Sequence, residues 1–274
     1  MIHPREEDRF DRSTRTGWLD MDSLHGARVL VAGAGALGNE AVKCLLLSGV
    51  RRIDLIDMDA VSGSNLNRCL FFRSDDATMR RDKAKVVADR AANLYPEATI
   101  RPIVGRVQLL KADDLRYYDM ILGCLDNISA RLHLNAQSYY AGVPYVDAGT
   151  DGMHGKVQVI LPPETPCLQC LVNSSHFKIL DRRQSCTGGP TSIYRAPLAA
   201  EITTTSVIAA IQVREALKVL CGHRDSCIHH VLIYDGMRNT MEVYEAEIDG
   251  RCAMHGELRN VHVAAGENSP SGME

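Results

Sequence analysis

The first half of the chain alternates between short apolar runs and segments whose apolar side chains recur at helical spacing. The apolar runs predict buried strands over residues 28–33, 51–57, 98–104, 118–126 and 143–149. The segments between them predict helices over residues 36–49, 82–94 and 128–141. Strands that alternate with helices are joined by right-handed crossovers. We therefore expect an α/β fold with a mostly parallel sheet and helices on both faces.

After residue 150 the pattern becomes typical of antiparallel strands around one long helix. Residues 156–162 alternate as a half-buried strand does, and residues 229–235 and 240–248 are expected to pair as strands. Residues 198–220 predict a long apolar helix. We expect this C-terminal part to extend the sheet in antiparallel fashion.

These patterns divide the chain into three parts. Residues 1–26 are polar, lack periodicity long enough to predict a helix, and are expected to form an N-terminal arm. Residues 27–256 form one domain, which includes a long crossover loop at about 163–194. Residues 257–274 are polar, with two glycines and two serines, and predict a flexible tail.

Composition and charge argue against several classes of partner. The 274 residues, 45% of them apolar, suffice to bury a large core. The net charge of −3 argues against general binding to nucleic acid or to acidic membranes. No stretch approaches the roughly 18 apolar residues of a membrane span, and the polar N-terminus has no signal-peptide core. We therefore expect a cytoplasmic protein whose partners include neither nucleic acid nor membrane.

A glycine-rich turn lies between the first predicted strand and the first predicted helix. The backbone N–H groups of such a turn can approach a phosphate at the positive end of the helix. The residues of this turn are Gly33, Gly35, Ala36 and Gly38. Asp57 ends the next strand, 19 residues after the last glycine, where an acidic residue commonly accepts the ribose hydroxyls. These features indicate a nucleotide site in a Rossmann-like sheet without identifying the nucleotide.

Charged residues at the same edge of the predicted sheet favour a triphosphate over a dinucleotide. Arg68 and Lys83 follow the second strand, and Asp126 ends the fourth. A triphosphate carries about four negative charges and needs added cations, often with a metal ion. A carboxylate beside a polyphosphate is repulsive unless a Mg²⁺ ion lies between them. We therefore expect ATP with Mg²⁺ rather than NAD.

Five motifs together resemble one family of enzymes. They are VAGAGALG, LIDMDAVSGSNLNR, DKAKV, CLDN and PCLQC. Over about residues 9–256, the chain is similar to the adenylating enzymes that activate ubiquitin-like and sulfur-carrier proteins, such as molybdopterin-synthase adenylyltransferase and its thiamine-pathway relative. The resemblance implies that residues 27–256 form an ATP-binding adenylation domain.

The resemblance also implies which residues bind ATP. Asp57 resembles the residue that holds the ribose, and Asp126 resembles the carboxylate that binds Mg²⁺. Lys83 resembles the lysine that reaches the α-phosphate region and steadies the charge built up during adenylation. The other polar residues expected in the nucleotide site are Ser64, Asn65, Arg68 and Asn127.

Arg12, in the segment RFDR, resembles an arginine that reaches the triphosphate bound by a neighbouring subunit. Such an arginine stabilises charge on the transferring phosphoryl group. The resemblance therefore implies a homodimer. Three positions depart from the family's pattern, because Ser13 and Cys69 stand where glutamine is common, and Arg80 stands where glycine is common.

A second group of residues has the spacing of a metal site. Cys167 and Cys170 form a C-x-x-C pair, and Cys252 with His255 forms a second pair. Thiols stay reduced in a chain without an export signal, so metal ligands are expected before disulfides. Three cysteines and one histidine are an ordinary tetrahedral Zn²⁺ set. Because no open coordination position is evident, we expect a structural zinc clip between the crossover loop and the C-terminal part.

Cys186, in the crossover loop, is a candidate nucleophile. Arg182 and Arg183 precede it closely, and nearby cations favour the thiolate. In the resembled family a cysteine in this loop sometimes takes the carrier as a thioester or persulfide, and some members do not need it. Both alternatives stay open.

The expected reaction is ATP-dependent adenylation of the C-terminal glycine of a small ubiquitin-like or sulfur-carrier protein, one that ends in Gly-Gly. The products are an acyl-adenylate and pyrophosphate, and transfer to a cysteine thiol is a further step to test. The expected catalytic residues are Arg12, Arg68, Lys83, Asp126 and Cys186. The alternatives are an NAD-dependent oxidoreductase, a non-catalytic nucleotide-binding partner, and adenylation of a peptide or a modified nucleoside.

Overall fold

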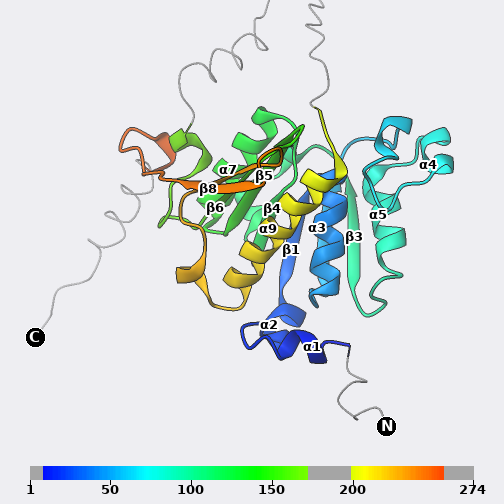
Figure 1. Cartoon of the computed structure of the whole chain (residues 1–274), viewed down its shortest axis with the longest axis horizontal. Coiled ribbons are helices and arrows are strands. Elements are labelled where there is room, and N and C mark those ends of the chain that lie inside the picture. Colours follow the sequence, from blue (N-terminus) through cyan, green and yellow to red (C-terminus); the bar gives the residue numbers. More distant parts are fainter. Residues whose placement is uncertain (1–8, 172–198, 256–274) are drawn as a thin grey trace, which may run out of the picture.

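The computed structural model describes residues 9–171 and 199–255, and its centre is a single sheet with helices on both faces (Figure 1). The strands are β1 (Arg28–Ala32), β2 (Arg52–Asp57), β3 (Thr99–Val104), β4 (Met120–Gly123), β5 (Tyr145–Asp151), β6 (His154–Ile160), β7 (Val231–Asp235) and β8 (Thr240–Tyr244). Their order in the sheet is β3-β2-β1-β4-β5-β6-β7-β8. Strands β1 to β5 run parallel, whereas β6, β7 and β8 are added in antiparallel pairs.

Helices cover both faces of this sheet. They are α1 (Asp11–Thr14), α2 (Met21–Gly26), α3 (Ala36–Leu47), α4 (Ser74–Thr78), α5 (Lys83–Ala91), α6 (Ala112–Leu115), α7 (Ile128–Ala141) and α9 (Ile202–Leu220). Short 3-10 turns are η2 (Gly63–Asn65), η3 (Val107–Leu109), η4 (Leu168–Leu171) and η5 (Arg224–Ser226). Helices α3, α5 and α9 pack on one face, and α6 and α7 pack on the other. None of the helices in the described residues is long and apolar enough to cross a bilayer.

Side chains that alternate along the strands supply both hydrophobic cores. In β1, Val29 and Val31 enter the core beneath α3 and α9, while Leu30 and Ala32 enter the core beneath α7. A strand buried on both faces is a continuous apolar run, which is why the central strands were predictable. The predicted α/β fold, with a mostly parallel sheet and an antiparallel C-terminal extension, is confirmed.

The structure differs from the sequence prediction in the N-terminal residues. No helix was expected in residues 1–26, yet α1 and α2 are both helical. The carboxylate of Asp20 caps α2 by accepting from the N–H of Asp22 at 3.1 Å. Phe10 and Leu24 are buried against the core. Helices of four and six residues have too few turns to show a periodic pattern.

The other differences concern where elements end. The apolar run 118–126 predicted a longer strand than β4, which ends at Gly123; Cys124 and Leu125 lie outside the strand although both remain at least partly buried. Strands β7 and β8 begin and end within the predicted ranges 229–235 and 240–248. The crossover loop lies largely within residues 172–198, which are outside the described part of the chain.

Candidate active site

A cavity of about 710 Å³ opens at the carboxyl ends of the parallel strands. The predicted nucleotide-site residues that line it are Gly33, Gly35, Ala36, Asp57, Asn65, Arg68, Lys83, Asp126 and Asn127. Gly38 and Ser64 do not line it. The carboxyl edge of a parallel sheet is where ligands bind in open α/β folds, so the location agrees with the expected site.

The glycine turn is shaped by close contacts that exclude a side chain. Gly33 has φ of +103°, and a β-carbon there would lie 2.3 Å from the carbonyl oxygen of Cys124. A β-carbon on Gly38 would lie 1.9 Å from the carbonyl oxygen of Gly33. Gly35 is the N-cap of α3 and offers no side chain to the first turn. The first N–H groups of α3 are therefore open to a ligand in the cavity.

Asp57 holds this turn against the end of β2. One carboxylate oxygen accepts from the N–H of Ala34 and the other accepts from the N–H of Asp59, both at 2.7 Å. Burial raises the pKa of Asp57, although these two hydrogen bonds and Lys83 oppose the shift. Each oxygen has a second lone pair, so the expected bond to a ribose hydroxyl remains available.

The two expected cations both reach the cavity from the connection between β2 and α5. Lys83 is the first residue of α5, and its Nζ lies 3.0 Å from a carboxylate oxygen of Asp59. Arg68 donates from Nη1 to the carbonyl oxygen of Ser64 and to the side chain of Asn67. Asp59 was not predicted from the sequence, although its place two residues after Asp57 in the same motif was a usable signal.

Asp126 and Asn127 follow β4 and have different surroundings. Asn127 Oδ1 caps α7 by accepting from the N–H of Ala130 at 2.8 Å. Asp126 is exposed to the cavity, and no described residue forms an ion pair or hydrogen bond with its side chain. A free carboxylate that lines this cavity fits a Mg²⁺ ligand.

The opposite wall of the cavity carries charges that sequence analysis did not single out. Arg131 on α7 pairs with the buried carboxylate of Asp147, with Nε 3.0 Å from Oδ1. The hydroxyl of Tyr145 donates to the same carboxylate at 2.7 Å. Lys156 on β6 lines the cavity beside this group, and burial lowers the pKa of its amine despite the nearby Asp147. Gly149, opposite Lys156 in the sheet, leaves space for the Arg131 guanidinium.

One predicted catalytic residue, Arg12, is not brought to this cavity. Arg12 is exposed on α1, which lies with α2 at the amino ends of the parallel strands, the opposite end from the cavity (Figure 1). Its expected role concerned a neighbouring subunit and stays a prediction. Cys186 lies outside the described residues.

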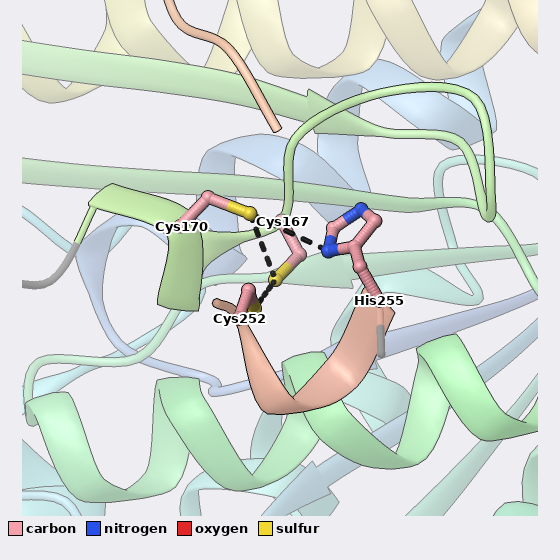
Figure 2. Close-up of side chains that lie close together, drawn as sticks. All are labelled: Cys167, Cys170, Cys252 and His255. Atoms are coloured by element: carbon pink, nitrogen blue, oxygen red, sulfur yellow. Dashed lines mark hydrogen bonds between the residues drawn. The ribbon is translucent and has the colours of Figure 1, made fainter. Parts of the chain in front are cut away.

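Cys167, Cys170, Cys252 and His255 form a compact cluster on the α7 face (Figure 2). Their ligand atoms all lie within 4.8 Å of one another. The Sγ of Cys167 is 3.8 Å from that of Cys170 and 3.7 Å from that of Cys252. His255 turns its Nδ1 toward Cys170, at 3.4 Å from Sγ.

These distances suit a tetrahedral metal ion. With Zn–S bonds of about 2.3 Å, the edge between two sulfurs of a tetrahedron is about 3.8 Å. The hydrogen bond from the Cys167 thiol lowers the pKa of Cys170, which favours the thiolate form that binds metal. The Nε2 of His255 is buried and has no hydrogen-bond partner among the described residues. The donor set and its spacing therefore fit Zn²⁺.

Comparison with known proteins finds one family over nearly the whole chain. The sequence profile of the ThiF family matches residues 10–253. The chain is 33% identical over 222 residues to molybdopterin-synthase adenylyltransferase of Salmonella typhimurium, a match that covers 79% of this chain and 82% of that protein.

Two activating enzymes match over a shorter part. SUMO-activating enzyme subunit 2 of Dictyostelium discoideum is 35% identical over 156 residues, which are 56% of this chain and 23% of that protein. The NEDD8-activating enzyme E1 catalytic subunit of Schizosaccharomyces pombe is 32% identical over 164 residues, 58% of this chain and 36% of that protein. The matched part thus spans about a quarter to a third of these longer relatives.

Solved structures with the same fold include E. coli MccB. Its complex with ATP gives a TM-score of 0.74 at 20% identity, covering 92% of this chain and 75% of that chain. The complex of MccB with N-formylated MccA gives a TM-score of 0.75 at 19% identity, covering 93% and 77%. At this identity the likeness establishes the fold alone.

Proposed function

The chain belongs to the ThiF family, and from this premise we propose that it transfers AMP from ATP to the C-terminal glycine of a small ubiquitin-like or sulfur-carrier protein. The observation that carries the proposal is the cavity, which gathers the glycine turn, Arg68, Lys83 and Asp126 at one sheet edge. The named activity of the bacterial relative, matched over 82% of its length, supports the same reaction class.

The residues of the cavity have different proposed roles in the reaction. The open N–H groups of α3 and the cations Arg68 and Lys83 offset the charge of the triphosphate. Mg²⁺, when bound by Asp126, neutralises further phosphate charge. A carboxylate oxygen of the carrier attacks the α-phosphorus, a new P–O bond forms, and the bond to the β-phosphate breaks as pyrophosphate leaves. This chemistry asks the protein for position and positive charge rather than for proton transfer.

Further parts of the proposal concern the rest of the chain. Cys167, Cys170, Cys252 and His255 hold a structural Zn²⁺ that ties η4 to the C-terminal residues. Arg12 reaches the nucleotide of the second subunit of a homodimer in the cytoplasm. A further proposed step is transfer of the activated carrier to the thiol of Cys186, which forms a thioester and releases AMP.

The direct test is exchange of labelled pyrophosphate into ATP. We expect exchange with Mg²⁺ and a candidate carrier that ends in Gly-Gly, and none when the terminal glycine is removed. Binding of NAD in place of ATP, measured by calorimetry, would support the oxidoreductase instead and overturn the proposal. Exchange with a short peptide and not with a carrier protein would mean that the substrate is a peptide, while the proposed adenylation reaction would stand.

A further inference from the structure

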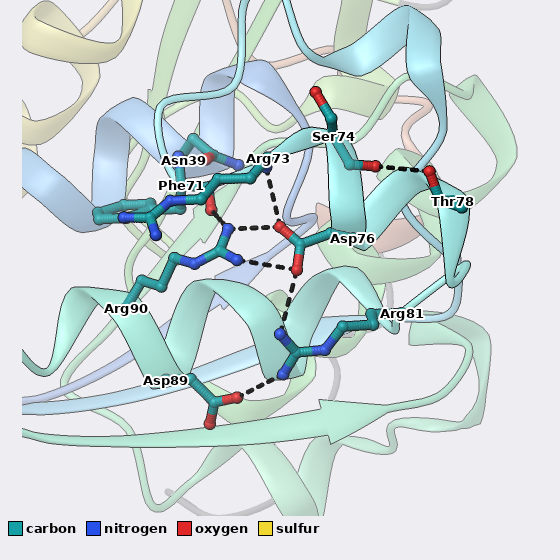
Figure 3. A network of polar contacts seen from close by, with 9 residues as sticks. All are labelled: Asn39, Phe71, Arg73, Ser74, Asp76, Thr78, Arg81, Asp89 and Arg90. Atoms are coloured by element: carbon teal, nitrogen blue, oxygen red, sulfur yellow. Dashed lines mark hydrogen bonds and ion pairs between the residues drawn. The ribbon is translucent and has the colours of Figure 1, made fainter.

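Asn39, in the first turn of α3, ties the glycine turn to the segment that follows Arg68. Its side chain is fully buried, and its Nδ2 donates to the carbonyl oxygens of Ala34 and Gly35, both at 2.9 Å. Its Oδ1 accepts from the N–H of Phe71, also at 2.9 Å (Figure 3). One amide group thus binds three backbone groups, two of them in the glycine turn.

Phe71 is held from its other side by the helix that begins at Lys83. Its carbonyl oxygen accepts from the guanidinium of Arg90, which lies on α5. The N–H of Phe71 is therefore bound to α3 and its C=O to α5. Since Phe71 lies only three residues after Arg68, this double attachment limits where Arg68 can lie relative to both helices.

Asp76 fixes the guanidinium of Arg90 in this place. Its carboxylate is 1% exposed and is bonded to Arg90 through both oxygens. It also accepts from Arg81 at 3.1 Å and from the backbone N–H of Arg73 at 2.8 Å (Figure 3). Burial alone would raise the pKa of Asp76, but the bonds from Arg90 and from the Arg73 N–H outweigh it and hold that pKa below its ordinary value. The carboxylate therefore stays charged and keeps both arginines in place.

We propose that Asn39 and Asp76 are positioning residues for the nucleotide: together they set the distance between the glycine turn and the cations Arg68 and Lys83. The inference rests on the proposed function, because it concerns the same ATP site. The network joins the three segments that carry phosphate-binding groups, and its own members do not line the cavity. They act on the ligand only through the residues that do line it.

This role predicts an effect that grows with the number of phosphates. A loosened network lets the glycine turn and the two cations move apart, so a ligand that spans both loses more than one that touches only one of them. ATP carries three phosphates and AMP carries one. A purely structural role would instead weaken both ligands to the same degree, or neither.

The test compares Asn39→Ala and Asp76→Asn with Asp54→Asn as a matched control. Asp54 on β2 also receives two bonds from one arginine, Arg101, and a third from Tyr118, yet it does not line the cavity. We expect the Kd of ATP–Mg²⁺ to rise roughly tenfold in the two network variants, and that of AMP less than about threefold. In the control, both constants should stay within about twofold while Tm falls.

Calorimetry at a temperature where each variant is folded gives both dissociation constants, and a thermal scan gives Tm. Arg90→Lys keeps the positive charge and one donor nitrogen but loses the two-nitrogen fork, so it should lose less ATP affinity than Asp76→Asn. It replaces Asn39→Ala in the comparison if that variant fails to fold. Equal losses for ATP and AMP, or an ATP affinity that is unchanged while Tm falls as in the control, would overturn the inference. Failure of the unmodified protein to bind ATP would overturn the proposed function itself.

Discussion

Two buried asparagines hold loops on opposite faces of the sheet. Asn39 on α3 accepts from the N–H of Phe71, and Asn135 on α7 accepts from the N–H of Leu168, each at 2.9 Å. Around Asn39, both amide atoms are bonded to protein groups. In the region of Asn135, by contrast, two buried nitrogen atoms have no hydrogen-bond partner among the described residues. They are the Nδ2 of Asn135 and the Nε2 of His255. The first loop leads to the proposed phosphate site, and the second carries half of the Cys/His cluster.

The difference shows how two functional regions of one fold are stabilised. We call the glycine turn, the segment around Phe71 and the start of α5 the phosphate end. It is fixed by hydrogen bonds and ion pairs that the chain supplies itself, so it is formed before the ligand binds. The cluster brings together thiols that repel one another once they are deprotonated, unless a cation lies between the thiolates. We therefore expect the two regions to respond to different perturbations.

Removal of Zn²⁺ tests this comparison with the largest expected effect. Chelation should lower Tm by more than about 10 °C, because a structural zinc site contributes several kcal/mol to folding. The Kd of ATP, measured well below the new Tm, should change less than about twofold. Elemental analysis and thermal scans check both statements. Cys170→Ser should reproduce the loss and Cys221→Ser, another partly buried cysteine, should not; a purified protein that contains no zinc would refute the metal site.

Asp126→Ala perturbs the other region and acts on rate rather than stability. Without this carboxylate the cavity loses its proposed Mg²⁺ ligand, and pyrophosphate exchange should fall by about 100-fold or more. Zinc content and Tm should stay unchanged, because the side chain is exposed and has no partner among the described residues. Asp113→Ala, at an exposed carboxylate outside the cavity, is the control. Undiminished exchange in Asp126→Ala would remove that residue from the site.

Asn135→Ala removes a hydrogen bond to a loop on the α7 face of the sheet, as Asn39→Ala does on the α3 face. Loss of the bond to Leu168 should cost about 1–3 kcal/mol and speed the release of zinc to a chelator, since Leu168 lies between two of the cysteines. The affinity for ATP should stay within about twofold of the unmodified protein. Zinc release is followed with a coloured chelator and ATP binding by calorimetry. If each asparagine variant altered both readouts, the two regions would be coupled and the comparison would fail.

Most of the fold was predictable because the central strands are buried on both faces. Runs such as residues 28–33 are continuous and apolar, and α7 matches the predicted 128–141 at both ends because Asn127 caps it and Gly142 ends it with φ of +72°. The short helices α1 and α2 were not predictable, since their stability comes from Phe10 and Leu24 docking on distant parts of the chain.

The site residues that belong to one sequence motif were predictable. Those on the other wall of the cavity, Arg131 and Lys156, were not. Arg68 and Lys83 follow the same strand as Asp57, so their meeting at one edge follows from the parallel topology. Arg131 and Lys156 come from a helix and an antiparallel strand, and their approach depends on the register that places Gly149 opposite Lys156. The pairing register of two strands cannot be predicted from a local pattern in either of them.

Arg80 offers the smallest and most local test of the phosphate end. Its φ is +49°, a left-handed conformation that costs a residue with a β-carbon about 1 kcal/mol relative to glycine. Its side chain is exposed and has no partner among the described residues, so nothing offsets that cost. Arg80→Gly should therefore raise Tm by about 2 °C in a thermal scan, reduced by the extra freedom that glycine gives the unfolded chain. Arg116→Gly, at an exposed arginine with φ of −61°, should lower Tm instead. Equal destabilisation by both changes would mean that the loop before Lys83 carries no strain, and that the phosphate end is relaxed without a glycine at this position.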